Sequence, residues 1–462
     1  MKNVLVLGAG LVARPLVRCL LDQPDFRVTV ASRTVSKAKA LVGDHPQGEA
    51  VAFDVTKDGA ALGDLVAQAD LAISLLPYIY HVRVAEECVR RRCHLVTTSY
   101  VKDEMRVLDG AAQEAGVILL NEMGLDPGID HMSAMRVIHR VHDAGGEVKS
   151  FRSYCGGLPA PDANDNPLGY KFSWSPRGVV LAGRNEARYL ENGRIVEVPN
   201  ERLFATHFVT WVEGLGDFEA YPNRDSLPYI NLYGIPETDT MYRGTLRNLG
   251  WCDAMQKLNE LGYFSLDERP DLPGKTFRQV MAELVYKVGA RSPRPYSVNT
   301  TNLEADLAVF LNLAPNSGVM MALEWLGLLS DALVPDRATL LDVLVDQMLV
   351  KMVYREMERD MVILVHEFVA AYPKTPFPGP HEEEWRREYI TSTLIDYGEP
   401  GGDTAMARTV GLPAAIGARL ILEGEINLTG VHIPVLPEIY EPVLGELAQL
   451  GIACVEKVEV LK

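Results

Sequence analysis

The first 130 residues alternate between short apolar runs and segments whose apolar residues recur at helical spacing. Lys2–Leu7 is a run of strand type, and Leu11–Leu21 follows with its leucines near one face of a helix. Similar apolar runs, with helical sequence between them, lie at 28–31, 51–54, 71–75, 94–100 and 117–124. Strands that alternate with helices are typical of right-handed βαβ units. The region therefore predicts an α/β fold with a doubly wound parallel sheet.

The pattern changes after about residue 130. The stretch 152–178 is rich in Gly, Pro and Asn and predicts a long irregular segment. Residues 300–355 are predicted to be helical, because the apolar positions of 340–353 trace one helical face. Two runs at 361–370 and 387–398 read as strands joined by a Pro-rich connection, and the tail at 404–424 is again helical.

Composition narrows the class of protein. A chain of 462 residues suggests two or three domains, and a net charge of −17 argues against nucleic acid or an anionic membrane as partner. The six cysteines form no CxxC pair, so neither a zinc site nor a disulfide framework is indicated. No uninterrupted apolar run of about 18 residues occurs. We expect a cytoplasmic protein.

A glycine-rich loop joins the first strand to the first helix. Its sequence is GxGxxA, from Gly8 to Ala13. Gly8 permits a tight turn, Gly10 lacks a Cβ that would block a pyrophosphate, and Ala13 lets helix and strand pack closely. The N–H groups at the helix start then face the phosphates. This context predicts a Rossmann-type dinucleotide site at Gly8, Gly10, Leu11, Val12 and Ala13.

The acidic residue expected about twenty residues further on is missing. In its place the second strand ends in Ser32, Arg33 and Thr34. A ribose 2′-hydroxyl is held by an acceptor, whereas a 2′-phosphate needs donors and positive charge. Arg33 supplies a planar cationic fork, and the two hydroxyls add donors. The segment favours NADP over NAD, although Arg33 as an ordinary solvated residue is the alternative.

Several long motifs resemble one known family. They are "VTVASRT", "DVTKDGAAL", "ISLLPYIYH", "HLVTTSYV", "NEMGLDPGIDH", "SYCGGLPAPDANDNPLGYKFSWSPRGV", "YPNRDS" and "RGTLRNLGW", in that order. The sequence is similar to the glutamate-forming saccharopine dehydrogenases, also called saccharopine reductases. The tail 405–424 also resembles this family, whereas 256–390 offers no strong family motif.

The resemblance implies a reaction and an architecture. Glutamate and 2-aminoadipate 6-semialdehyde condense to an imine, which NADPH reduces to saccharopine. The implied Rossmann domain is 1–130, completed by roughly 400–462. A mixed α/β domain, 131–260 with 355–400, binds saccharopine and mediates a homodimer, and 261–354 is a small helical domain. Because the chain begins at the Rossmann strand, the stand-alone form of lysine biosynthesis is expected.

The substrate of that reaction carries three carboxylates and a secondary amine. Arg is the best residue for two-pronged carboxylate binding. Arg224 and Arg247 match substrate contacts of the family, and Thr245 with the backbone of Leu246 adds contacts nearby. Ser99 and Tyr100, at a strand end, can hydrogen-bond one carboxylate.

The catalytic candidates are Asp126, Tyr100 and Cys155. Asp126 lies in "GLDPG", where a turn-forming Asp is the plain reading. Through the resemblance it contacts both cofactor and substrate and helps to move the proton of the amine. Tyr100 and Cys155 are the candidates for the acid that assists loss of water, and Cys155 as a small buried residue is the alternative.

The remaining cofactor positions follow from the motif match. Adenine contacts are expected from Asp54 and Val55, and the ribose and nicotinamide side is expected at Leu75, Leu76, Pro77, Thr98, Ser99, Leu125, Asp126, Pro127, Trp174 and Ser175. Core packing is the alternative for Leu75 and Leu76.

His131, His139 and His142 lie on one predicted helix, where we expect a helix surface and no metal, because no further ligand has matching spacing.

Two other functions are alternatives. A carboxynorspermidine- or homospermidine-forming imine reductase would need fewer carboxylate partners. An NADP-binding sensor without chemistry would not need the two substrate arginines.

Overall fold

The structure is a computed structural model, which describes residues 1–57, 59–289, 302–374 and 385–461. The chain divides into two compact units. The first comprises Met1–Lys149, Asn231–Glu237 and His366–Lys462, and the second comprises Ser150–Ile230 and Thr238–Val365. The first unit is therefore assembled from stretches that are far apart in the sequence.

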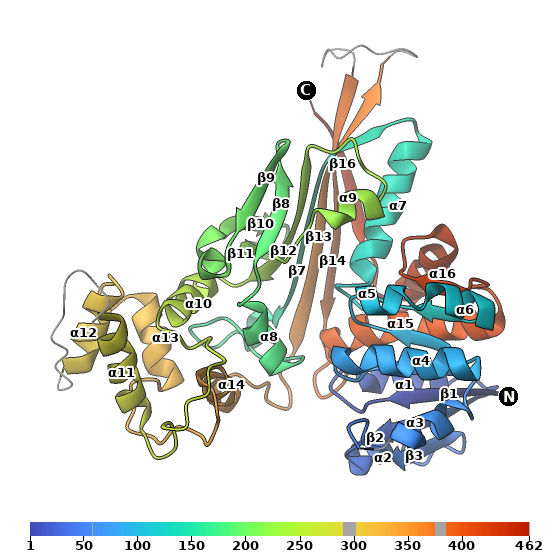
Figure 1. Cartoon of the computed structure of the whole chain (residues 1–462). Helices are drawn as coiled ribbons and strands as arrows, with labels where there is room; N and C mark the ends of the chain where they lie inside the picture. The colour runs from blue at the N-terminus through green and yellow to red at the C-terminus, as the bar shows by residue number, and fades with distance from the viewer. Residues whose placement is uncertain (58, 290–301, 375–384, 462) are drawn as a thin grey trace. The chain divides into compact units, whose positions relative to one another are not determined.

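The core of the first unit is a seven-stranded sheet in the order β15-β6-β5-β4-β1-β2-β3 (Figure 1). All neighbouring strands in it are parallel. The strands are β1 (Lys2–Leu7), β2 (Phe26–Ser32), β3 (Gly48–Ala52), β4 (Leu71–Ser74), β5 (His94–Thr97), β6 (Ile118–Leu120) and β15 (Gly430–His432). The predicted α/β class with a parallel Rossmann-type sheet is confirmed. Its last strand, β15, comes from the C-terminal part of the chain.

Helices connect these strands and bury their apolar faces. They are α1 (Ala13–Leu21), α2 (Val35–Val42), α3 (Gly59–Val66), η1 (Tyr78–Tyr80), α4 (His81–Arg91), α5 (Asp103–Arg106), α6 (Asp109–Ala115), α7 (Ile129–Asp143), α15 (Ala405–Glu423) and α16 (Pro437–Gln449). Helix α15 is long and apolar enough to cross a membrane, yet most of its apolar stretch is buried. It packs along α1 and against β4 and β5, as a core helix does.

The second sheet is mixed and contains nine strands. Its order is β10-β11-β12-β7-β13-β14-β16, with β8 pairing β12 and β9. β12 and β7 are parallel, whereas β12 and β11 are antiparallel. The strands are β7 (Glu147–Pro159), β8 (Ala187–Glu191), β9 (Arg194–Val198), β10 (Phe208–Val212), β11 (Gly216–Pro222), β12 (Thr240–Arg247), β13 (Asp360–Pro373), β14 (Trp385–Tyr397) and β16 (Val455–Leu461). The two predicted strands at 361–370 and 387–398 are thus confirmed as parts of β13 and β14, and the connection between them lies largely outside the described residues.

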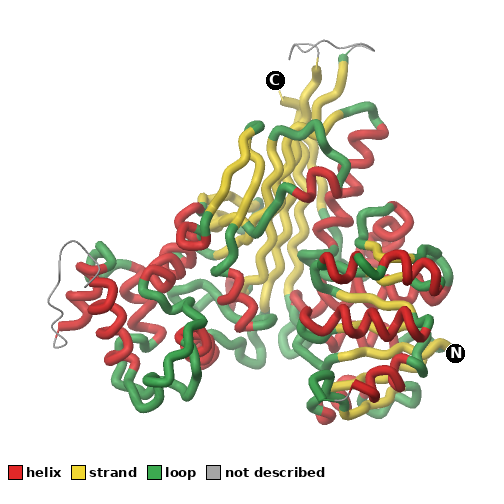
Figure 2. The backbone as a smooth tube through the Cα atoms, viewed as in Figure 1, coloured by secondary structure: helices red, strands yellow, loops and turns green. Residues whose placement is uncertain are grey.

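Short helices complete the second unit. They are η2 (Pro161–Ala163), α8 (Pro176–Ala182), η3 (Asn200–Arg202), η4 (Phe204–Thr206), α10 (Trp251–Glu260), α11 (Phe277–Gly289), α12 (Leu303–Phe310), α13 (Gly318–Leu326) and α14 (Leu340–Lys351), with α9 (Pro228–Leu232) at its border. Helices α11 to α14 gather in one group, at the lower left of Figures 1 and 2. The predicted helical stretch 300–355 is interrupted, because Asn312 and Gly327 adopt left-handed backbone angles that end α12 and α13.

The close approach of α15 to the glycine-rich loop gives a stability prediction. A Cβ at Gly411 of α15 would lie 2.8 Å from the carbonyl oxygen of Val12, a backbone atom that cannot move aside cheaply. We expect Gly411→Ala to lower the free energy of unfolding by about 1–2 kcal/mol, since overpacking outweighs the gain in helix propensity. Thermal unfolding followed by circular dichroism measures this change.

Gly445 of α16 provides the matched control, because a Cβ there would meet nothing within 4 Å. Gly445→Ala should leave the midpoint unchanged or raise it. Equal midpoints for the two variants would contradict the close packing of α15 on the loop.

Candidate active site

The glycine-rich loop has the geometry that the sequence predicts. Gly8 adopts a φ of +117°, and a Cβ there would lie 3.1 Å from the backbone oxygen of Leu75. At Gly10 a Cβ would meet no atom within 4 Å, so the space beside this residue is open to a ligand. Ala13 begins α1 and is fully buried. No side chain caps the start of α1, which leaves its N–H groups available to a phosphate.

A free cation lies at the end of β2. Arg33 is exposed and forms no salt bridge with any residue in the described part of the chain. The N–H of Thr34 donates to Ser32 Oγ at 3.3 Å. Hydrogen bonds from Thr56 hold the pKa of the nearby Asp54 below its usual value, with smaller contributions from Lys57 and Arg33. The end of β2 therefore offers a cation and hydroxyls, as a 2′-phosphate requires.

The other cofactor candidates of the first unit follow the carboxyl ends of neighbouring strands. Asp54 and Val55 follow β3, and Leu75 and Leu76 follow β4. Thr98 and Ser99 follow β5 and are partly exposed. The side chain of Val55 belongs to the hydrophobic core, and Leu76 packs against that core, so their backbone atoms are the parts that a ligand can reach.

Tyr100 and Asp126 form a direct pair. The hydroxyl of Tyr100 donates to Asp126 Oδ1 at 2.5 Å. Asp126 is the only residue of 121–130 that is not buried. The loop around it is tight, because a Cβ at Gly128 would lie 1.9 Å from the carbonyl oxygen of Gly124. The carboxylate is thus presented by a tightly packed, buried loop.

Glu122 and His131 form a buried polar network next to the segments that carry this pair. Glu122 has a left-handed backbone with a φ of +63°, which is uncommon for a residue with a Cβ. Its Oε1 accepts from the N–H of Val101 at 2.8 Å, and its Oε2 lies 2.7 Å from Nε2 of His131. His131 Nδ1 lies 2.6 Å from the hydroxyl of Tyr233. Glu122 therefore connects the segment that carries Tyr100 to the loop that carries Asp126.

The expectation of a helix surface for the three histidines is wrong for His131, which is fully buried on α7. His139 and His142 are partly buried and contact Tyr440 and Glu237. The pattern of the helix alone did not reveal these partners, because they come from distant parts of the sequence.

His81 is another buried histidine, and the sequence pattern did not predict its role. His81 begins α4 and is only 5% exposed. Its ring nitrogens lie 2.9 Å from Ser74 Oγ and 2.9 Å from Ser99 Oγ. The signal available in the sequence was its place seven residues after a strand end, which is too weak on its own to mark a site.

In the second unit, β12 gathers the remaining candidates on one face. Its register places Thr245 beside Tyr221 of β11 and Cys155 of β7. Because side chains alternate along a strand, Arg247 lies on the same face as Thr245, and Leu246 lies on the other. Leu246 is fully buried, so only its backbone can serve a ligand.

Arg247 is a buried cation in an aromatic surround. It is 5% exposed, and its guanidinium carbon lies 4.9, 5.5 and 5.9 Å from the ring centres of Tyr170, Trp251 and Tyr221, respectively. Burial raises the pKa of both tyrosines, so these rings are neutral. Among the described residues, no carboxylate forms a salt bridge with Arg247 and its Nε has no hydrogen-bond partner.

The carboxylate of Glu219, which lies opposite Arg247 in the sheet, forms hydrogen bonds with other groups. Glu219 pairs with Arg247 across β11 and β12, but its oxygens accept from the N–H groups of Gly250 and Cys252, at 2.7 Å each. A buried charge without a counter-ion is costly, and cation–π contacts offset only part of that cost. Arg247 is therefore suited to an anionic ligand.

The other candidates of the second unit are more exposed. Arg224 lies in the loop after β11 with a φ of +58°, and its carbonyl accepts from the N–H of Arg188 at 2.9 Å. Ser175 caps α8 by accepting from the N–H of Gly178, and Trp174 beside it is partly buried. The Ser175 hydroxyl therefore has a structural partner already.

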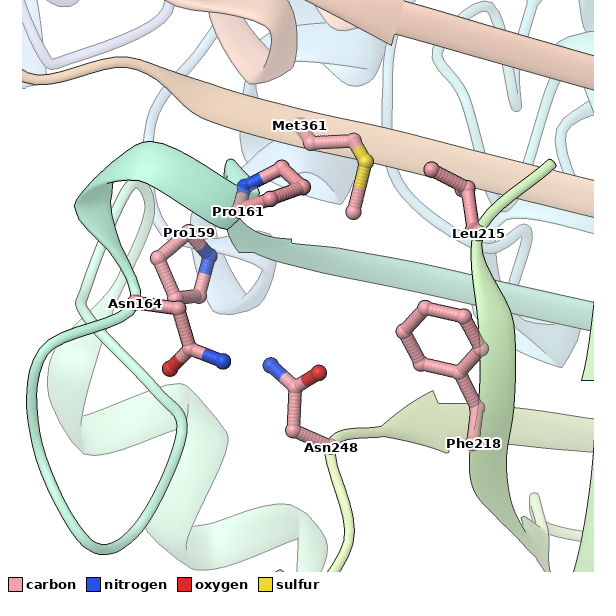
Figure 3. Close-up of a pocket in the computed structure, with 7 residues that line it drawn as sticks. All are labelled: Pro159, Pro161, Asn164, Leu215, Phe218, Asn248 and Met361. Carbon is pink, nitrogen blue, oxygen red and sulfur yellow. The ribbon is translucent and has the colours of Figure 1, made fainter.

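A separate cavity of about 200 Å³ also lies in the second unit (Figure 3). It is lined by Pro159, Pro161, Asn164, Leu215, Phe218, Asn248 and Met361. Figure 3 shows the amide groups of Asn164 and Asn248 turned toward one another. None of the predicted site residues lines this cavity.

Two family models match consecutive parts of the chain. Residues 4–120 match the saccharopine dehydrogenase NADP binding domain, and residues 124–452 match the saccharopine dehydrogenase C-terminal domain. The chain is 41% identical to the NADP(+)-dependent, L-glutamate-forming saccharopine dehydrogenase of Pyricularia oryzae, over 99% of both proteins.

Solved structures give the same result. The apo saccharopine dehydrogenase (L-Glu forming) of Saccharomyces cerevisiae superposes with a TM-score of 0.86, at 39% identity, over 99% of this chain and 100% of that one. The homospermidine synthase of Legionella pneumophila in complex with NAD has a TM-score of 0.53 at 10% identity, over 100% of this chain and 91% of that one, which shows a shared fold only.

The Glu122 network gives a second prediction. Glu122→Ala would leave the partly buried N–H of Val101 and the buried Nε2 of His131 without their partner. We expect it to lower the free energy of unfolding by about 3 kcal/mol, because two hydrogen-bonding groups lose their partner at once. Glu122→Gln should cost less, because its amide oxygen still accepts from Val101.

Urea unfolding followed by circular dichroism measures both variants. Glu104→Ala, at an exposed position on α5, is the control and should leave the midpoint unchanged. A midpoint for Glu122→Ala that matches this control would show that the network does not hold the two loops together.

Proposed function

The chain belongs to the saccharopine dehydrogenase family, and we propose that it catalyses the NADP-dependent, L-glutamate-forming reaction of that family. In this reaction L-glutamate, 2-aminoadipate 6-semialdehyde and NADPH are interconverted with saccharopine and NADP+ through an imine, with release of water in the reductive direction. The reaction belongs to lysine biosynthesis by the aminoadipate route. The single observation that carries the proposal beyond likeness is the buried Arg247, which forms no salt bridge with any described residue.

Arg247 fits a substrate with several carboxylates. Its guanidinium lies among three aromatic rings, on the face of β12 that also carries Thr245. Nη1 donates to the carbonyl of Leu246 at 2.7 Å, whereas Nε has no hydrogen-bond partner among the described residues. A bound carboxylate would offer acceptors to the guanidinium and cancel the buried charge. Arg224 is proposed as a second carboxylate ligand, with Thr245 and the backbone of Leu246 as further contacts.

The proton chemistry is assigned to Tyr100 and Asp126. When bound, NADPH supplies the hydride that reduces the imine carbon. The Asp126 carboxylate is proposed to hold the charge of the substrate amine, and its hydrogen bond from Tyr100 lets a proton pass between the two groups. Tyr100 is the proposed acid for loss of water, and Cys155 is the alternative.

The residues of the first unit fit an NADP cofactor. The open space at Gly10 and the uncapped start of α1 suit the pyrophosphate, and Arg33 with Ser32 and Thr34 suits the 2′-phosphate. The remaining proposed cofactor contacts are Leu11, Val12, Ala13, Asp54, Val55, Leu75, Leu76, Thr98, Ser99, Leu125, Asp126, Pro127, Trp174 and Ser175.

The alternatives are less well supported. A homospermidine-type enzyme would place a buried, unpaired Arg247 where its substrate offers no matching carboxylate. A sensor without chemistry would have no use for the Tyr100–Asp126 pair in its tightly packed loop. The expected homodimer and the domain boundaries given above stay proposals. A cytoplasmic location is supported by the cysteines, none of which forms a disulfide in the described part of the chain.

Arg247→Met tests the function directly. The wild-type protein should reduce NADP+ when saccharopine is added, as measured by the absorbance of reduced nicotinamide. The variant should raise the KM for saccharopine by about 100-fold, the size expected for losing charged hydrogen bonds to a carboxylate. It should also raise the thermal midpoint, because a buried unpaired cation is removed.

Arg194→Met, at an exposed position of β9, is the control and should leave both quantities unchanged. Arg247→Lys should lie between wild type and Arg247→Met, since it keeps the charge and loses the fork. Tight NADPH binding without any turnover of saccharopine would overturn the proposed enzyme.

Arg33→Ala tests the proposed preference for NADP+ over NAD+. The wild type should prefer NADP+ to NAD+ strongly, and the variant should lose about 10-fold or more of that ratio of kcat/KM values, because one charged phosphate contact is removed. Arg27→Ala, an exposed arginine at the other end of β2, is the control. An unchanged ratio would mean that Arg33 does not bind the 2′-phosphate.

A further inference from the structure

Ser74, His81 and Ser99 form a linear chain of hydrogen bonds at the carboxyl ends of two neighbouring strands. Ser74 ends β4, and Ser99 follows β5, which pairs with β4 in parallel. His81 spans them, with Nδ1 at 2.9 Å from Ser74 Oγ and Nε2 at 2.9 Å from Ser99 Oγ. Ser74 is completely buried, whereas Ser99 is partly exposed and is predicted to contact both the substrate and the cofactor.

The imidazole of His81 is neutral. Burial, together with the positive charge of Lys102, lowers the pKa of His81 to about 4. Lys102 is exposed, and its ammonium lies 4.3 Å from the ring centre of Tyr78. At neutral pH the ring therefore carries one N–H, which is either on Nδ1 or on Nε2.

The buried serine decides which nitrogen carries the proton. Ser74 Oγ has no hydrogen-bond partner other than His81 among the residues that the structure describes. Its hydroxyl proton must therefore be donated to Nδ1, because a buried donor without an acceptor is costly. Since Nδ1 accepts, the ring proton is on Nε2 and is donated to Ser99 Oγ.

We propose that His81 is a positioning residue that makes Ser99 a hydrogen-bond donor to a carboxylate oxygen of the amino-acid substrate. Once Ser99 Oγ accepts from Nε2–H, its own proton points away from the ring and is free for a ligand acceptor. With the opposite tautomer, Ser99 would donate to His81 and would present only lone pairs, which suit an ammonium group. The proposal rests on the proposed function for the identity of the substrate, but the proton order is a property of the chain alone.

The proton order is measured by nitrogen NMR on protein labelled with 15N-histidine, with the His81 signals assigned by their absence in His81→Gln. We expect the chemical shift of a protonated Nε2 and an unprotonated Nδ1, unchanged between pH 6 and pH 8. A protonated Nδ1 would overturn the proposal. This measurement needs no turnover, so it distinguishes failure of the proposal from failure of the proposed function.

Two amide variants provide a matched kinetic pair. The amide nitrogen of Gln reaches the place of Nε2 and can donate to Ser99, whereas the shorter Asn reaches only the place of Nδ1, beside Ser74. We expect His81→Asn to raise the KM for saccharopine by about 10-fold with little change in kcat, and His81→Gln to stay within about 2-fold of wild type. Equal effects of the two variants on KM would overturn the proposal.

A double-mutant cycle separates this role from a general loss of structure. Ser99→Ala should raise the KM for saccharopine by about 10-fold, and His81→Asn should add nothing further in that background, because it acts through Ser99. The Kd for NADPH should stay unchanged in the His81 variants. A full additional effect of His81→Asn in the Ser99→Ala background, or a change that falls on the Kd for NADPH alone, would overturn the assignment to the substrate carboxylate.

Discussion

The parallel pairing of the first sheet is the constraint on which the rest of the first unit depends. Because all its strands run in one direction, their carboxyl ends meet at one edge, and the loops that leave them must share that edge. Short buried strands therefore bring together side chains from residues 8 to 126. Apart from their last residues, such as Ser32 of β2 and Ser74 of β4, the strands supply no proposed ligand contacts and serve to fix where each loop begins.

The two units differ in whether a buried polar side chain has partners within the protein. In the first unit, the carboxylate of Glu122 is fully used by His131 and Val101, so the network stabilises the loops without a ligand. In the second unit, Arg247 forms no salt bridge with any described residue, and its Nε has no hydrogen-bond partner there. A buried network whose groups are all hydrogen-bonded stabilises the fold by itself. A buried charge without a partner lowers the stability of the free protein, and a ligand that pairs with this charge removes that cost.

Local signals in the sequence were enough to predict the parallel sheet and the loops that leave its strands. The glycine loop, the strand ends and the missing acid before Arg33 are read within a few residues, and the parallel sheet follows from them. His81, Glu122 and His131 were misread or missed because their partners lie 7 to 102 residues away in the chain. The burial of Arg247 also depends on rings from three separate segments, so "RGTLRNLG" alone gave no sign of it. The breaks at Asn312 and Gly327 were missed because the helical prediction for 300–355 rested on the apolar periodicity of 340–353.

The C-terminal strand and helix of the first unit affect how this protein is made. β15 pairs with β6, and the carbonyl of His432 accepts from the N–H of Asn121, directly before the loop that carries Asp126. Helix α15 supports the glycine loop from the same late part of the chain. During synthesis on the ribosome, the early strands emerge long before these two pieces exist. The nucleotide-binding half of the enzyme thus reaches its final form only after nearly all of the chain has been translated, and a prematurely terminated chain lacks the pieces that complete it.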